Sequence, residues 1–89
     1  MEAFTQIDGA LAICKYPKGV QKQVQLYKRR DRVYVPHSGG YVEVRHEDIG
    51  GATVVTAHPD VKVLEMDDVP GITIASQGGL KLVRWSPRK

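Results

Sequence analysis

Apolar residues in this chain recur at every second position, and this alternation limits the folds that the chain can adopt. The segment 21–27 is the clearest case: Val24 and Leu26 fall on one side, and Gln23, Gln25 and Tyr27 fall on the other. A period of two is typical of strands that pack one face against a core. No stretch of ten or more residues has the spacing of an apolar helix face, so the sequence predicts no long helix.

Turn-forming residues divide the alternating segments at intervals of about 8 to 12 residues. The predicted strands are a short run around residues 11–13 that ends at Tyr16, then 21–27, 32–35, 41–45, 52–57, 61–66, 71–75 and 80–85. We expect residues 21–45 to form a three-stranded meander, with an exposed hairpin loop at 28–31. The predicted fold class is all-β, a small antiparallel barrel or sandwich (SH3-like or OB-like) of about six to eight short strands.

The chain has 89 residues, enough for one small core, and this excludes a large multi-part enzyme. We predict a single domain over residues 1–85 and a frayed basic tail over 86–89. Cys14 is the only cysteine, so no internal disulfide can form, and we expect a buried, inert thiol. Trp85 is predicted to lie in the core or at the rim of the barrel.

The sequence also carries an expectation about location. It contains no apolar run of about 18 residues, and its first residues are acidic where a signal peptide would be basic. We therefore predict a cytoplasmic protein that does not bind membranes. The small size suits an accessory protein of a phage or another mobile element.

The net charge of +3 conceals a strong segregation along the chain. Residues 15–32 hold seven basic residues and one acid, a net charge of +6, whereas residues 43–68 hold seven acids and two basic residues, a net charge of −5. The last nine residues add four positive charges. If the basic segments meet in space, the domain has one positive pole and one negative pole, which suits phosphate binding, self-association or docking onto a charged partner. Opposite charges that lie side by side in the fold would instead cancel.

Three of the four tyrosines are predicted to share the outer face of the 21–45 meander with arginines and glutamines. The residues assigned to this face are Gln23, Gln25, Tyr27, Arg32, Tyr34, Tyr41, Glu43 and Arg45. Tyrosine and arginine are enriched in protein interfaces, and the same mixture stacks bases and holds phosphates in single-stranded nucleic acid complexes. Tyrosines are also simply good strand formers. The candidate partner-binding residues are Tyr27, Arg29, Arg30, Arg32, Tyr34, Tyr41 and Arg45.

No catalytic residue, metal site or cofactor is predicted. The histidines at 37, 46 and 58 match no familiar zinc spacing, and His37 with Ser38 is better explained as turn chemistry than as a base beside a nucleophile. One enzyme hypothesis stays open: residues 45–48 with His58 contain the acid, base and phosphate-binding groups of a small metal-independent nuclease.

The favoured function is therefore a non-catalytic interaction module. We expect it to bind a protein partner, or a second copy of itself, through the tyrosine-bearing sheet face and an open sheet edge. The alternative is a nucleic-acid-binding small β-barrel that uses the basic loop 28–32 and the tyrosines. The residues indicate no small-molecule substrate.

Overall fold

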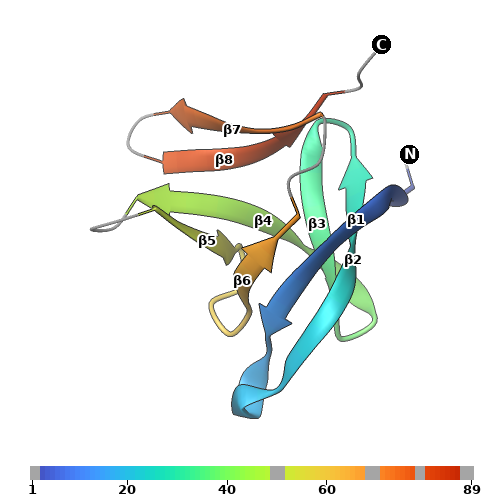
Figure 1. Ribbon diagram of the computed structural model, residues 1–89, viewed down its shortest axis with the longest axis vertical. Coiled ribbons are helices and arrows are strands. Elements are labelled where there is room, and N and C mark those ends of the chain that lie inside the picture. The colour runs from blue at the N-terminus through green and yellow to red at the C-terminus, as the bar shows by residue number, and fades with distance from the viewer. Residues whose placement is uncertain (1–2, 49–51, 68–70, 78–79, 87–89) are drawn as a thin grey trace.

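The computed structural model describes residues 3–48, 52–67, 71–77 and 80–86, and within them the protein is built from eight strands (Figure 1). The strands are β1 (Thr5–Lys15), β2 (Gln21–Arg29), β3 (Arg32–His37), β4 (Gly40–Asp48), β5 (Ala52–Thr56), β6 (Lys62–Met66), β7 (Ile72–Gln77) and β8 (Leu80–Trp85). Among the described residues the only helical element is the single 3-10 turn η1 (Pro17–Gly19), and no helix there could span a membrane. The all-β prediction is confirmed.

The first six strands form a closed antiparallel barrel. Each strand from β1 to β6 pairs with the next, and β6 pairs back with β1, so the sheet closes on itself. The hairpin of β7 and β8 joins the barrel through β8, which pairs with the second half of β4 and touches β3 (Figure 1). The predicted small antiparallel barrel is confirmed, as is the three-stranded meander, which consists of β2, β3 and β4.

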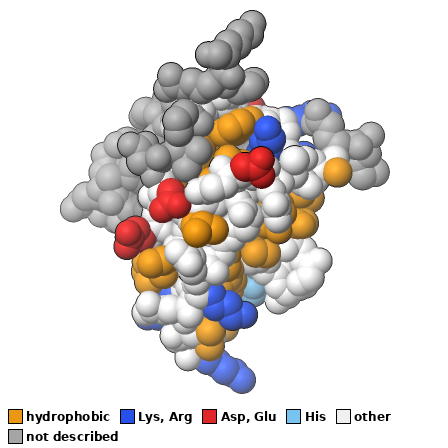
Figure 2. Space-filling model, turned by 45° about the vertical axis from the view of Figure 1, so that its right-hand side comes forward, with side chains coloured by type: hydrophobic (Ala, Val, Ile, Leu, Met, Phe, Trp, Pro, Cys, Tyr) orange, Lys and Arg blue, Asp and Glu red, His pale blue; other side chains and the backbone are white. Residues whose placement is uncertain are grey.

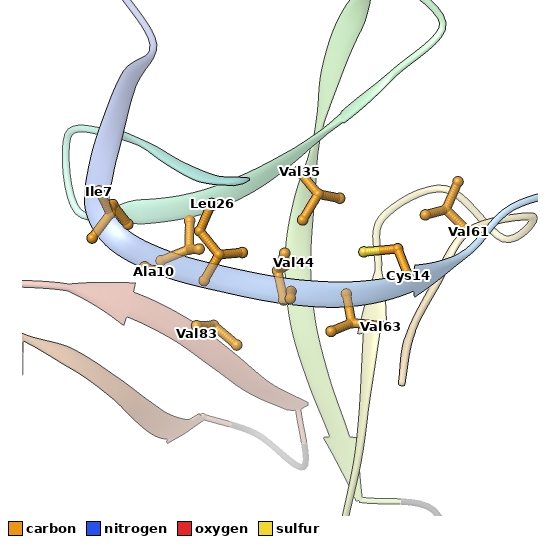
Figure 3. Packing of buried hydrophobic residues seen from close by; sticks show 11 residues of the cluster. Ile7, Ala10, Cys14, Leu26, Val35, Val44, Val61, Val63 and Val83 are labelled. Atoms are coloured by element: carbon orange, nitrogen blue, oxygen red, sulfur yellow. The ribbon is translucent and has the colours of Figure 1, made fainter. Parts of the chain in front are cut away.

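The inward side chains of the barrel form one apolar cluster (Figure 3). Leu26, Val33, Val35 and Val44, which the alternation placed inside, are fully buried. Around them lie Ile7, Ala10, Ala12, Cys14, Val61, Val63 and Val83. The buried position of Cys14 and the packing of half-buried Trp85 against the cluster agree with the sequence analysis.

β1 begins well before the short run that the sequence predicted, because a bulge in it breaks the alternation. Ile7 and Ala10 are both buried although they are three residues apart, and between them Gly9 has a φ of 74°. The strand register shifts between Gln6 and Leu11, and there the side-chain amide of Gln25 donates to two carbonyls, at 2.6 Å to Ile7 O and 2.9 Å to Ala10 O. Gln25 is therefore a half-buried structural residue.

The predicted exposed loop at 28–31 is wrong in its extent. β2 continues through Arg29, and only Arg30 and Asp31 form the turn. Charged residues fit this strand because their long side chains lie over aromatic rings: Lys28 Nζ is 4.5 Å from the Trp85 ring centroid, and Arg29 Cζ is 4.5 Å from that of Phe4.

The turn between β2 and β3 meets the end of β8. The backbone N–H of Trp85 donates to Asp31 O at 2.8 Å, and the Arg84 guanidinium donates to the Asp31 carboxylate. The Ser86 N–H donates to Gly71 O at 2.8 Å, and the other residues of the predicted tail, 87–89, lie outside the described part of the chain. The basic hairpin of β2 and β3 therefore adjoins Arg84 of β8, and the acidic Asp31 lies at their contact.

We expect the substitution Gln25→Glu to lower the stability of the barrel. A carboxylate cannot donate to the carbonyls of Ile7 and Ala10, and each unsatisfied buried group costs about 1–3 kcal/mol. The midpoint of thermal unfolding measures the loss. Gln23→Glu, an equivalent change at an exposed position of the same strand, should change the stability by no more than about 0.5 kcal/mol. Equal effects of the two substitutions would contradict the bulge assignment.

Candidate functional site

The pairing between β2 and β3 covers only half of each strand. It joins Arg29 to Arg32, Lys28 to Val33 and Tyr27 to Tyr34, and it goes no further. The residues that flank a two-residue turn form a hydrogen-bonded pair, and such pairs then alternate along an antiparallel ladder. Tyr27 and Tyr34 are therefore the second hydrogen-bonded pair.

Pro36 explains why the ladder stops. In the same register the next hydrogen-bonded pair would be Gln25 with Pro36, but proline has no backbone N–H to donate. The carbonyl of Pro36 is also occupied, because the Tyr16 hydroxyl donates to it at 2.7 Å. Position 36 of β3 therefore offers β2 no N–H, and the pairing of the two strands ends at Tyr27 and Tyr34.

The end of this pairing leaves one edge of β2 uncovered. Residues 21–25 pair with β1 on one side, and no described strand pairs with them on the other. By the alternation of the ladder, the N–H and C=O groups of Gln21, Gln23 and Gln25 face this open edge, and those of Lys22 and Val24 face β1. The position of Val20 agrees, since its carbonyl accepts from the Tyr16 N–H at 2.7 Å on the β1 side.

A groove of about 700 Å³ lies along the open edge. We call it the edge groove, and it is lined by Tyr16, Pro17, Val20, Lys22, Val24, Pro36, His37, Ser38, Gly39, Gly40 and Tyr41. Figure 2 shows apolar side chains, a histidine and Lys or Arg side chains together at the lower end of the molecule, where η1 and the turn between β3 and β4 lie in Figure 1. The groove is thus apolar and aromatic, with a cationic component.

Tyr16 and His37, which both line the edge groove, belong to a row of three rings in contact. His37 stacks on Tyr16 with their centroids 5.8 Å apart, and His58, from the turn between β5 and β6, meets His37 at 4.7 Å. Burial, together with the neighbouring Cys14 thiol, raises the pKa of Tyr16 to about 12. The Tyr16 hydroxyl therefore stays protonated at neutral pH and keeps its hydrogen bond to Pro36.

The three predicted tyrosines lie together on the outer face of the meander, with one addition. Phe4 stacks on Tyr41 with centroids 4.2 Å apart and meets Tyr34 edge-on at 4.8 Å, and Tyr27 meets Tyr41 at 4.8 Å. We call these four residues the aromatic cluster. Arg29 lies over Phe4 and, at 5.7 Å, over Tyr34. Tyr41, 38% exposed, belongs both to this cluster and to the edge groove, so the two surfaces are continuous.

The other predicted arginines have different surroundings. Arg32 Nη1 is 2.5 Å from Glu43 Oε2 and its Nε is 3.8 Å from Asp31 Oδ1, so acidic residues neutralise it locally. The hydrogen bond from Arg84 holds the pKa of Asp31 below its ordinary value, which keeps that carboxylate charged. Arg30 is exposed in the turn, with a φ of 57°.

The structure separates Arg45 from the tyrosines. Arg45 lines a smaller cavity of about 280 Å³ with Thr56, His58 and Lys62, among others. Of the residues in the nuclease hypothesis, 46–48 belong to β4 but their side chains lie outside the described part, and His58 Nδ1 accepts from the Asp60 N–H at 3.3 Å. Within the described residues no three His, Cys, Asp or Glu side chains gather as metal ligands would.

The local sequence pattern did not indicate the roles of several residues in this region. Tyr16 and Pro36 were interpreted only as strand end and turn, and nothing in the local pattern indicates that one caps the other across 20 positions. A proline inside an otherwise alternating strand was the available signal, because it marks a strand position that faces an open edge. No sequence signal marked Phe4, since Tyr34 and Tyr41, which its ring contacts, are distant in the sequence.

Comparison with protein-family models, curated proteins and solved structures gave no match.

Titration at high pH tests the environment of Tyr16. A raised pKa stabilises the fold fully below pH 10, the ordinary tyrosine value, and this contribution is lost as the pH rises from 10 to about 12. We expect absorbance titration to resolve one tyrosine ionising near pH 12, and Tyr16→Phe to remove it and to flatten the fall in stability over that range. Tyr41→Phe, at an exposed ring, should leave the step near pH 12 in place. Loss of this step in the Tyr41→Phe variant would contradict its assignment to Tyr16.

Amide hydrogen exchange tests the open edge. By the alternation of the ladder, the N–H groups of Lys22 and Val24 point toward β1, whereas that of Gln23 points to the open edge. We expect the first two to exchange at least about 100-fold more slowly than the third, since exposed backbone groups need no opening to exchange. Comparable protection of all three would show that the edge of β2 is covered.

Proposed function

We propose that this protein is a non-catalytic interaction module that binds an extended segment of a partner protein along the open edge of β2. The carrying observation is the uncovered edge at residues 21–25 beside the edge groove. A row of unpaired N–H and C=O groups is a template for one more strand, and an adjoining groove supplies pockets for alternate side chains. The tyrosine face takes part through Tyr41.

The size of the groove supports a single strand as the ligand. Five residues of an extended chain span about 17 Å, comparable to the length of β2 that is uncovered. β3 and its turn to β4 line the opposite side of the groove, so the site accepts a flexible segment more readily than the edge of a second folded sheet. β7 also has one strand neighbour in the described chain, but the groove lies beside β2.

The contacts of the arginines favour a protein over a nucleic acid. Arg32 and Arg84 are paired with Glu43 and Asp31, and the Arg29 guanidinium lies over Phe4 and Tyr34, on ring faces that a base would need for stacking. Protein interfaces, in contrast, use aromatic side chains that are already held in place, because little side-chain entropy is lost on binding.

A proline at position 23 is expected to impair the binding of an added strand without lowering the stability of the barrel much. The Gln23 N–H faces the open edge of β2, so Gln23→Pro should change the stability by less than about 1 kcal/mol while removing a donor that an added strand needs. Val24→Pro removes a bond to β1 and should cost about 2 kcal/mol or more. Thermal unfolding of both variants provides the measurement.

The binding readout is cross-linking in a lysate of the native host. A photoreactive amino acid in place of exposed Val20 should form adducts with identified proteins, and Gln23→Pro should abolish those adducts. The same group in place of Leu64, exposed on β6 and outside the groove lining, is the control. Adducts that persist in the Gln23→Pro variant, or adducts with nucleic acid alone, would rule out the proposal.

A further inference from the structure

The chemistry of the edge groove also indicates which sequence the bound segment carries. This inference rests on the proposed function. Val20, Lys22 and Val24 all line the groove, and because they are spaced by two they project on the same side of the chain. The site therefore presents a symmetrical row, apolar then cationic then apolar, to whatever lies beside it.

The cation in this row is held in place. Lys22 Nζ lies 5.5 Å from the centroid of the Tyr16 ring, and Tyr16 is itself fixed by its hydrogen bond to Pro36. Among the described residues that line the groove, none is Asp or Glu. Lys18, exposed on η1, adds a second positive charge near the same end. The groove thus has an unbalanced positive charge between two apolar contacts.

We propose that the edge groove binds an extended segment of a partner protein with the pattern apolar-x-acidic-x-apolar, paired as a strand with residues 20–24. Residues directly opposite in paired strands interact, so the acidic side chain meets Lys22 and the two apolar side chains meet Val20 and Val24. The row reads the same in both directions, so a segment running either way along β2 satisfies it.

The occupant is a different protein rather than a second copy of this chain. No Asp or Glu in the sequence has apolar residues other than proline at both positions two residues away. The Asp and Glu residues of this chain therefore do not supply the pattern. Binding of an acidic segment is also consistent with the excess of basic residues between positions 15 and 32.

Two synthetic peptides test the inference by calorimetric titration. One is acetylated and amidated Gly-Ser-Val-Thr-Glu-Thr-Val-Ser-Gly, and the other has lysine in place of the glutamate. We expect the wild-type protein to bind the glutamate peptide at least about tenfold more tightly, with the difference shrinking at high salt. Lys22→Glu should invert the preference, because the like charges are then opposite the glutamate peptide. Lys62→Glu, the same change in net charge outside the groove, should leave it unaltered.

Amide exchange in the complex identifies the mode of binding. The glutamate peptide should slow exchange of the Gln21 and Gln23 amides and leave those of Lys22 and Val24 unchanged. Equal affinity for the two peptides, no binding of either, or binding without protection of Gln23 would overturn the inference. The lysate cross-links from position 20 do not depend on the sequence of the synthetic peptides. If those cross-links form but the glutamate peptide fails these tests, the apolar-x-acidic-x-apolar pattern is refuted and the proposed binding of an extended segment is not.

Discussion

The open edge of β2 and the edge groove lie where Pro36 interrupts β3 and the Tyr16 hydroxyl donates to the Pro36 carbonyl. Pro36 has no N–H to donate, and its carbonyl accepts from Tyr16, at the position where the pairing of β2 with β3 ends after two hydrogen-bonded pairs. A residue with a backbone N–H at position 36 would allow the ladder to extend, and the edge groove would then narrow. The contact between Tyr16, which directly precedes η1, and Pro36 of β3 thus lies at the place where the edge of β2 stays open within a closed barrel.

The rest of the barrel is arranged so that this opening does not compromise the core. The buried cluster runs from Ile7 to Val61 (Figure 3), and Tyr16, which lines the groove, also packs against this cluster. The bulge in β1 lets Ile7 and Ala10 both point inward, and Gln25 satisfies the carbonyls that the bulge exposes. The carbonyls at the bulge are thus hydrogen-bonded, whereas the edge of β2 at residues 21–25 has no strand partner among the described residues.

The sequence predicted the regular parts of this fold and missed the irregular ones. Alternation placed Leu26, Val33, Val35 and Val44 in the core, because a strand with one buried face has a fixed period of two. It failed at β1, where a bulge changes the parity, and at Lys28 and Arg29, where charge suggested a loop but aromatic rings receive the side chains. Of the candidate residues, Tyr27, Tyr34, Tyr41 and Arg29 come together, whereas Arg45 lies apart, because β4 is long enough to leave the meander.

Alone, the sequence determined an all-β domain, a small barrel or sandwich, with one small core and tyrosines on one outer face, since these follow from local alternation and turn chemistry. The tertiary structure decided which edge stays open and which charges remain unbalanced. Pairing between Tyr16 and Pro36, between Arg32 and Glu43, and between Arg84 and Asp31 joins residues 11 to 53 positions apart. No local pattern records such contacts, because they form only when the closed barrel brings the strands side by side.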